Sequence, residues 1–432
     1  MPTLRSRRVV VDGEVRPATI RHEGGSIVEV GDGPADVDFG DLVVLPGLVD
    51  GHVHVNEPGR AEWEGFATAT RAAVAGGTTT IVDMPLNSIP PTVDVAALHQ
   101  KRDAARPAVA CDVAFWGGVV PGSEQHVDGL VAEGVCGFKA FMVDSGVEEF
   151  SPLPAAALGR VASVLAAAGV PLLVHAEDPD HLLAPAGDPR RYATYLATRP
   201  PEAEASAIRQ VAGIASRTGV TAHVLHVSSA AAVEALAESG LSGETCPHYL
   251  TFDAAEIPDG ATAFKCAPPI RGAGDRERLW EALREGVLTM VVSDHSPAPP
   301  EVKESSTGDF LAAWGGIASL ELRLAATWDG ARRRGFGLVD LARWLASAPA
   351  DLAGLGHRKG RIAPGQDADF VVFDPDGVTE VDQSRLRQRH PLTPYHGMSL
   401  AGCVVATYLR GVQVHGDGAG GPRPGVLLRR GD

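Results

Sequence analysis

A pair of histidines at the end of an apolar run is the first feature that could carry chemistry. The run ends in Asp50-Gly51-His52-Val53-His54, and side chains two residues apart on a strand point to the same face. Two imidazoles on one face can hold one metal ion. A single histidine is more often a hydrogen-bonded or surface residue, but a His-x-His pair at a strand end favours metal binding. We therefore predict that His52 and His54 are metal ligands.

Further ligand types stand at the ends of later apolar runs, at His175, His226 and Asp294. His223 and His226 are separated by an odd number of residues, so they should face opposite ways on a strand. We predict that His226, nearer the end of its run, is the ligand and that His223 supports it or packs. Asp294 is predicted to be an anionic ligand and a possible base, while the adjacent His295 could be either functional or structural. Imidazole and carboxylate together suit zinc and related ions.

Lys139 lies between apolar neighbours in Gly137-Phe138-Lys139-Ala140-Phe141. A buried ammonium is costly unless it is paired or neutralised. One interpretation is an ion pair with a buried carboxylate. The other is a carbamate, formed when CO2 adds to the neutral amine, whose carboxylate can bridge two metal ions. The ligand types on the other runs favour the carbamate.

The elements that must position these residues repeat between residues 42 and 296. A short apolar run, a polar loop and an alanine-rich stretch recur, which predicts parallel strands joined by helices. About eight such units predict an α/β fold, a (β/α)8 TIM barrel, whose active site lies at the C-terminal ends of its strands. The predicted strands are Leu42–Val55, Thr78–Met84, Cys111–Val120, Gly137–Val143, Pro171–Glu177, Ala222–Ser229, Glu244–Tyr249 and Leu288–Ser296. The predicted helices include Glu62–Val74, Val93–Ala105, Pro154–Ala168, Glu202–Thr218 and Ala230–Glu238.

The two ends of the chain have short strand patterns instead. Neither end is long enough to form a stable domain alone, but together they reach the size of a small one. We expect a small β-sandwich domain built from both termini, with its parts at residues 1–47 and 358–432 and the metal-dependent barrel at 48–357. The strand patterns are Arg8–Val11, Glu14–Arg21, Ser26–Val30, Phe370–Phe373 and Val404–Val414.

Composition narrows the function classes. The 432 residues carry 38 Lys and Arg against 54 Asp and Glu, a formal charge of −16, which disfavours a nucleic-acid partner. No apolar run reaches the roughly 18 residues of a membrane span, and the N-terminus lacks the apolar region of a signal peptide. The five cysteines form no C-x-x-C pair, which fits a reducing compartment. We expect a cytoplasmic protein with no membrane partner.

The order of the candidate ligands, HxH, Lys, His, His, Asp, resembles that of the cyclic amidohydrolases, the group that contains dihydroorotases, hydantoinases and allantoinases. The resemblance extends from Pro46-Gly47-Leu48-Val49-Asp50 to the segment 360–369. It implies two divalent metal ions, zinc first among zinc, manganese, cobalt and nickel, bridged by carbamylated Lys139 and a hydroxide. By this resemblance one ion is held by His52, His54 and Asp294, the other by His175 and His226, and the protein is a homotetramer.

Finer motifs are most similar to the members of the group that open allantoin to allantoate in purine catabolism. These motifs are residues 52–60, 63–66, 83–88, 144–147 and 313–316. Dihydroorotases typically have an arginine at the position of Asn56, to pair with the substrate carboxylate. The resemblance implies that Asp294 moves the proton and that Asn56, Asn87 and Ser145 contact the substrate. A hydantoinase (dihydropyrimidinase) of broader specificity is the alternative enzyme. A non-catalytic scaffold barrel is disfavoured because all six ligand types are present.

Overall fold

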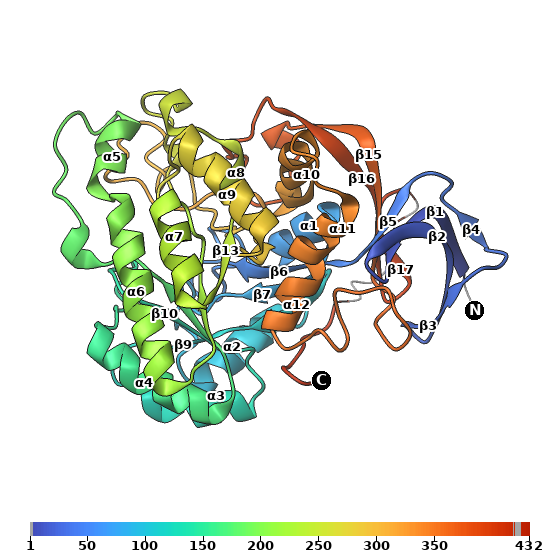
Figure 1. Cartoon of the computed structure of the whole chain (residues 1–432), viewed down its shortest axis with the longest axis horizontal. Coiled ribbons are helices and arrows are strands. Elements are labelled where there is room, and N and C mark those ends of the chain that lie inside the picture. The colour runs from blue at the N-terminus through green and yellow to red at the C-terminus, as the bar shows by residue number, and fades with distance from the viewer. Residues whose placement is uncertain (1–2, 418, 420–424) are drawn as a thin grey trace.

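The computed structural model describes residues 3–417, 419 and 425–432. Figure 1 shows a large body of helices around parallel strands, with a sheet at one side that combines strands from both ends of the chain. Within the described part of the chain, no helix is both long enough and apolar enough to cross a membrane.

The large body is a barrel of parallel strands. One arc has the order β6-β7-β8 and the other the order β14-β13-β12-β11-β10-β9. β8 and β9 are two pieces of one strand separated by Trp116, and a parallel bridge between Val53 and His295 joins the two outer edges. The barrel therefore closes with eight strand positions, and the predicted fold class is confirmed. The strands are β6 (Leu48–Val53), β7 (Thr78–Asp83), β8 (Asp112–Phe115), β9 (Gly117–Gly118), β10 (Phe138–Phe141), β11 (Leu172–His175), β12 (Ala222–Val224), β13 (Ser242–Thr245) and β14 (Met290–Val291).

Helices surround the barrel and bury their apolar faces on it (Figure 1). The predicted helices are confirmed, but the first begins at Phe66, one turn after the predicted Glu62, and the others shift by at most two residues at an end. α7 shows why they start and stop where they do: the Ser229 side chain accepts from the backbone N–H of Ala232, and Gly240 ends the helix with φ 70°. The helices are α1 (Phe66–Ala75), α2 (Val95–Ala105), α3 (Val127–Ala132), α4 (Ala155–Ala168), α5 (Tyr192–Thr198), α6 (Pro201–Thr218), α7 (Ala230–Ser239), α8 (Pro247–Thr251), α9 (Ala273–Glu285), α10 (Arg323–Arg333), α11 (Leu338–Ala342) and α12 (Ala348–Leu352).

The sheet beside the barrel has the order β17-β16-β15-β5-β1-β2-β3, with β4 paired to β1. β5 from the N-terminal part lies between β1 and β15, so strands from both ends of the chain share one sheet. The strands are β1 (Thr3–Val11), β2 (Glu14–Glu23), β3 (Ser26–Gly31), β4 (Val37–Asp38), β5 (Val43–Pro46), β15 (Phe370–Glu380), β16 (Ser399–Leu409) and β17 (Val412–His415).

Five predicted strands were wrong in extent. The third, Cys111–Val120, is interrupted at Trp116, and the sixth, Ala222–Ser229, is regular only over Ala222–Val224. The first, Leu42–Val55, is two strands in different sheets, separated at Gly47, where a side chain would overlap Thr79 and Asp369. The seventh ends at Thr245 because Pro247 begins α8, and proline fits the first turn of a helix better than a central strand. The eighth is regular only over Met290–Val291.

A buried ion cluster connects the barrel to this sheet. Lys359 Nζ lies 2.6 Å from Asp112 Oδ2, 2.7 Å from Asp367 Oδ2 and 2.7 Å from Asp369 Oδ2. Asp112 belongs to barrel strand β8, and Asp369 directly precedes β15. Arg410 also pairs with Asp112. One fully buried ammonium thus neutralises carboxylates from both parts of the molecule.

Replacing Lys359 by Met should destabilise the protein by about 3–5 kcal/mol, because it leaves buried carboxylates without their cation. Urea unfolding measures the change. The control is Arg361→Met, which removes an exposed pair with Asp351 at 2.7 Å and should cost less than about 1 kcal/mol. Equal losses in the two variants would contradict a stabilising role for the buried cluster.

Candidate active site

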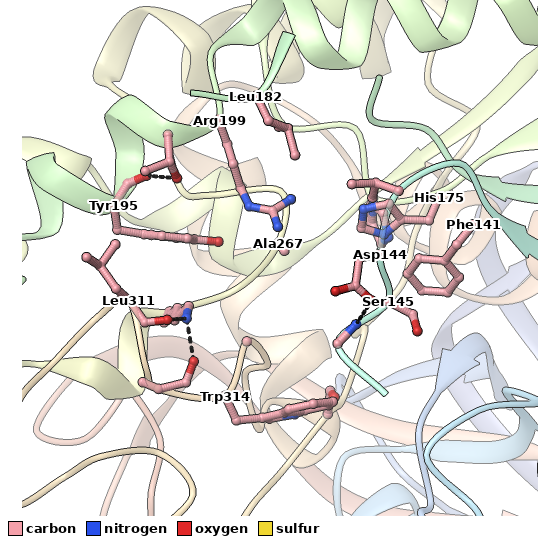
Figure 2. A pocket seen from close by; sticks show the side chains of 18 of the residues that line it. Phe141, Asp144, Ser145, His175, Leu182, Tyr195, Arg199, Ala267, Leu311 and Trp314 are labelled. Carbon is pink, nitrogen blue, oxygen red and sulfur yellow. Dashed lines mark hydrogen bonds between the residues drawn. The ribbon is translucent and has the colours of Figure 1, made fainter. Parts of the chain in front are cut away.

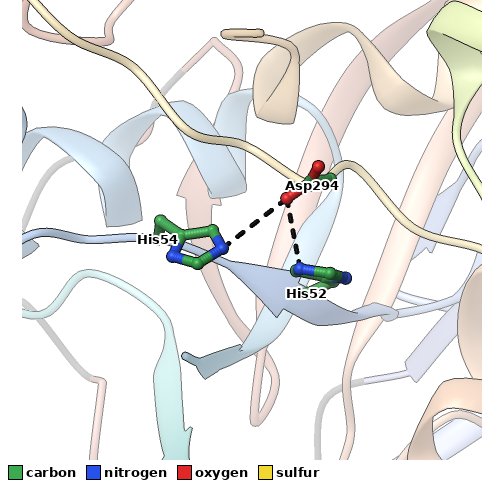
Figure 3. A group of neighbouring side chains, drawn as sticks. All are labelled: His52, His54 and Asp294. Carbon is green, nitrogen blue, oxygen red and sulfur yellow. Dashed lines mark ion pairs between the residues drawn. The ribbon is translucent and has the colours of Figure 1, made fainter. Parts of the chain in front are cut away.

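His52 and His54 lie on β6 and at its end, and both face Asp294, which follows β14 (Figure 3). The Oδ1 atom of Asp294 is 3.1 Å from His52 Nε2 and 3.6 Å from His54 Nε2. One potential ligand atom from each of the three residues lies within 4.8 Å of the other two, and all three side chains are buried. The structure therefore brings together three of the predicted ligands from opposite ends of the barrel sequence.

The other three predicted ligands lie beside them. The ring centroids of His175 and His226 are 4.6 Å apart, and those of His52 and His226 are 5.4 Å apart. Lys139 Nζ is 3.2 Å from His52 Nε2. All six residues thus gather at the C-terminal end of the barrel, where the strand positions predicted them.

Backbone conformation helps to aim these side chains. His226 and Asp294 follow the ends of β12 and β14, with φ values of 37° and 44°. Asn56 and Asn87 have φ values of 68° and 70°. Residues other than glycine rarely adopt this left-handed region, and such conformations concentrate at functional sites. The four positions lie at the same end of the barrel.

Burial sets the charge state of the site. It lowers the pKa values of His52, His54 and His226 well below the ordinary value, so these rings are neutral and keep a lone pair for a ligand. Burial also lowers the pKa of Lys139 to about 8, which makes the neutral amine accessible. The carboxyl group of Asp294 is shifted the other way, because burial raises its pKa to about 7.

Each histidine of the His-x-His pair has a polar partner on its other nitrogen. Glu244 Oε1 is 2.6 Å from His52 Nδ1, and Glu244 Oε2 is 3.1 Å from His223 Nε2. Asn87 Nδ2 is 3.3 Å from His54 Nδ1. Because the Nδ1 atoms make these contacts, the Nε2 atoms of His52 and His54 are the ones that face Asp294. His223 takes the supporting place predicted for it, through Glu244, which the sequence analysis missed although a carboxylate on a buried strand could have indicated it.

The residues fit a metal centre. The donors include neutral imidazoles and a carboxylate, which zinc and its neighbours prefer, and the Lys139 amine would become a carboxylate donor on carbamylation. His226 Nδ1 is buried with no hydrogen-bond partner among the described residues, an arrangement that costs free energy unless something binds there. A second donor group, Cys246, His248 and Asp294, shares the same carboxylate. His295 points elsewhere: its Nδ1 accepts from the backbone N–H of Ser319 at 3.2 Å, which is a structural role.

A cavity of about 640 Å³ opens beside the donors. Five of the six, all except His52, contribute to its lining, and Figure 2 shows the wall opposite them, with Tyr195, Arg199 and Leu311. The size suits a small organic molecule.

Two of the three residues predicted to contact the substrate line the cavity, and the third does not. Asn87 and Ser145 line the cavity, although the Ser145 hydroxyl donates to the Phe150 carbonyl at 2.6 Å and so offers only its oxygen. Asn56 is not part of the described lining: it is 1% exposed, and its Nδ2 donates to the Pro297 carbonyl at 3.2 Å. The contact of Asn56 with the substrate stays a prediction, and in this structure the amide nitrogen is used by a neighbouring loop.

Two buried lysines hold the loop that forms one wall. Lys303 Nζ donates to the carbonyls of Lys265 at 3.1 Å, Trp314 at 2.9 Å and Gly316 at 2.7 Å. Lys265 Nζ donates to the Leu311 carbonyl at 3.0 Å. The lysines thus satisfy carbonyls of the loop segment that carries Trp314, and the sequence pattern did not predict this role.

A parallel barrel with imidazole, carboxylate and amine donors at one cavity is typical of hydrolases that use metal ions. The chain matches the amidohydrolase family over residues 43–414, and it belongs to that family, as the sequence resemblance predicted.

Individual relatives agree with this membership. The chain is 48% identical to the allantoinase of Streptomyces avermitilis over 99% of this chain and 98% of that protein. It is 42% identical to the allantoinase of Saccharomyces cerevisiae, over 95% of each chain. Among solved structures, it is similar to the L-hydantoinase (dihydropyrimidinase) of Arthrobacter aurescens, with a TM-score of 0.91, 29% identity and 100% of both chains covered.

Proposed function

We propose that this chain hydrolyses the cyclic amide of allantoin to give allantoate. The observation that carries the proposal is the gathering of all six ligand types at one cavity, in a chain 48% identical to a known allantoinase along nearly its whole length. The protein is a hydrolase of cyclic amides. A hydantoinase of broader specificity is the second candidate, because solved hydantoinase structures share the fold at 29–30% identity.

In this proposal two divalent metal ions bind at the site, zinc being the first candidate and manganese, cobalt and nickel the others. His52, His54 and Asp294 would hold one ion and His175 and His226 the other, and Lys139, once carbamylated by CO2, would supply carboxylate oxygens to both. When bound, the ions lower the pKa of water toward neutrality and polarise the scissile carbonyl. The neutral imidazoles and the accessible neutral amine of Lys139 support this assignment.

Asp294 moves the proton. Its Oδ1 atom lies between the Nε2 atoms of His52 and His54 at the cavity. It accepts a proton as water attacks the carbonyl carbon, and it donates that proton to the ring nitrogen that leaves, because an amide anion is a poor leaving group. Asn87 and Ser145 contribute an amide and a hydroxyl oxygen on the wall, which suit the ring and ureido groups of the substrate.

From the family resemblance we also propose that the protein is a homotetramer in the cytoplasm, with the barrel at residues 48–357 and a small β domain made of 1–47 and 358–432. Gel filtration with light scattering tests the subunit number.

Allantoin should be hydrolysed at least tens of times more efficiently than dihydroorotate, on the order of 10²-fold or more in kcat/KM. Dihydroorotate carries a carboxylate, whose desolvation without a cation is costly. Arg199, the guanidinium on the cavity wall, is already paired with Glu177 at 2.6 Å, and Lys265 already donates to loop carbonyls. The margin over simple hydantoin should be smaller, because only the ureido contacts differ.

The measurement is turnover of racemic allantoin, hydantoin and dihydroorotate by the same metal-loaded sample, with a chelator-treated sample as the control. Dihydroorotate as the best substrate would refute the proposed substrate, and hydantoin as the best would support the second candidate. Elemental analysis separates both enzymes from a scaffold barrel: about two ions per chain are expected for an enzyme and none for a scaffold.

A further inference from the structure

One predicted ligand, His175, has a partner arrangement unlike those of His52 and His54. Its Nε2 atom is 2.6 Å from Glu177 Oε2, two residues further along the chain. The same Oε2 atom is 2.6 Å from Arg199 Nη1. The Glu177 side chain is fully buried, whereas Arg199 lines the cavity (Figure 2). A single carboxylate oxygen therefore connects the His175 ring to a cation on the cavity wall.

This arrangement selects one form of the imidazole. A carboxylate can only accept hydrogen bonds, so the proton of neutral His175 must sit on Nε2, and the lone pair must sit on Nδ1. The Oε2 atom of Glu177 lies 2.6 Å from both His175 Nε2 and Arg199 Nη1, so it accepts from two donors at once, as a carboxylate oxygen can. His52 and His54 differ, since their Nδ1 atoms take the supporting contacts and their Nε2 atoms face Asp294.

The plane of the His175 ring is fixed as well. The ring stacks on Phe141 with centroids 4.5 Å apart and an interplanar angle of 16°. Stacking restricts the tilt of the ring, and the bond to Glu177 restricts its rotation about the side chain. Arg199 in turn restricts Glu177, whose other oxygen, Oε1, has no hydrogen-bond partner among the described residues. Without Arg199, the carboxylate would keep only the histidine contact.

We infer that Glu177 and Arg199 are positioning residues that hold His175 in the Nε2–H form, with Nδ1 directed to the metal centre, and that they tie this ligand to the cavity wall. The inference rests on the proposed function in taking His175 as a metal ligand. Glu177 is fully buried and Arg199 pairs with it, so we assign their effect on the metal to His175. The alternative is that the pair serves only to anchor the start of α6 to the barrel.

The test measures metal binding rather than turnover. Zinc affinity is determined by dialysis of the full-length chain against buffered zinc, and the visible absorption spectrum of the cobalt-loaded chain reports the ligand geometry. Glu177→Gln should weaken binding of one ion by roughly 10- to 100-fold, the usual effect of removing a ligand's hydrogen-bond partner, and should change the cobalt spectrum. The thermal unfolding of each metal-free variant shows that it is folded.

Asp178 supplies a matched control. Its Oδ2 accepts from Ser206 Oγ at 2.6 Å and Gln210 Nε2 at 2.7 Å, both on α6, so it anchors the same helix from the same loop. Asp178→Asn should lower stability without changing the zinc affinity or the cobalt spectrum. Equal effects of Asp178→Asn and Glu177→Gln on the metal would overturn the inference, since a purely structural anchor would then explain both.

A second pair of variants keeps the inference testable if Glu177→Gln does not fold. Arg199→Lys retains a cation for Glu177 and should lose less zinc affinity than Arg199→Met, which should approach the loss of Glu177→Gln. Wild-type affinity and spectrum in Arg199→Met and in any folded Glu177→Gln would overturn the inference. A wild-type chain that binds two ions but does not open allantoin would refute the proposed substrate and leave this inference standing.

Discussion

Asp294→Asn is expected to lower turnover by roughly 10²–10⁴-fold, the usual effect of losing a general acid or base. Asparagine keeps the size of the side chain and one oxygen donor, but it cannot carry a proton. The side chain is buried at the cavity, where burial raises the pKa of the carboxyl group to about 7. A carboxylate can take up a proton and the resulting carboxyl group can release it, whereas an amide does neither near neutral pH. Steady-state kinetics on allantoin measure the loss.

Elemental analysis of the same variant separates the two roles of Asp294. If metal content stays near that of the wild type while turnover falls, the lost function is proton transfer. If both fall together, coordination is the larger contribution. Turnover close to that of the wild type would leave Asp294 as a ligand at most, and the proposed proton path would have to be withdrawn.

Lys139→Ala is expected to lose both bound metal and activity. Lys139 Nζ lies 3.2 Å from His52 Nε2 and lines the cavity, so its removal takes away the proposed bridge and leaves an opening at the same place. A short carboxylic acid such as propionate can enter that opening and offer the two oxygens of the missing carbamate. Metal content and turnover should therefore recover in part when propionate and zinc are added together.

Propionamide is the control for this rescue, because it has nearly the same size, lacks a carboxylate and has no amine that CO2 could carbamylate. Equal recovery with both compounds would contradict a carbamate and favour a simple effect of filling the space. A Lys139→Ala variant with full metal and full turnover would show that Lys139 is not a bridge. Mass spectrometry of the intact wild-type chain under native conditions should detect the added CO2.

The barrel and the six gathered residues could be predicted because both depend on local patterns. Alternating runs and alanine-rich stretches indicate βα units, and chemistry concentrates at one end of such a barrel. The directions of His226 and Asp294 were predicted from strand alternation, yet both residues lie beyond their strands. Their left-handed backbones, with φ values of 37° and 44°, help set where the side chains point. The prediction that these side chains lie close to the other ligands was right, but the assumption that they point there from regular strands was not.

The supporting contacts could not be predicted because they join residues distant in sequence. Glu244 is 192 residues from His52 and Lys359 is 247 from Asp112, and no local period indicates such pairs. The partner of Asn56 could not be predicted for a related reason. Its residue type suits a substrate contact, but its amide is used by the Pro297 carbonyl of a loop after β14. Residue type indicates what a side chain can bind, whereas the tertiary fold decides which partner reaches it.

The amine of Lys303, with its three carbonyl partners, bears on how molecules enter the cavity. To swing the Trp314 loop outward, the chain would have to pull the carbonyls of Trp314 and Gly316 away from the buried Lys303 amine. Leaving these buried groups without hydrogen bonds is costly, so we expect this side of the cavity to be a rigid wall and not a gate. The opening must lie along the exposed segments on the far side, near Asp144 and Leu183. A rigid wall on this side would limit the size of the molecules that reach the donors, and this limit would act before any contact with them.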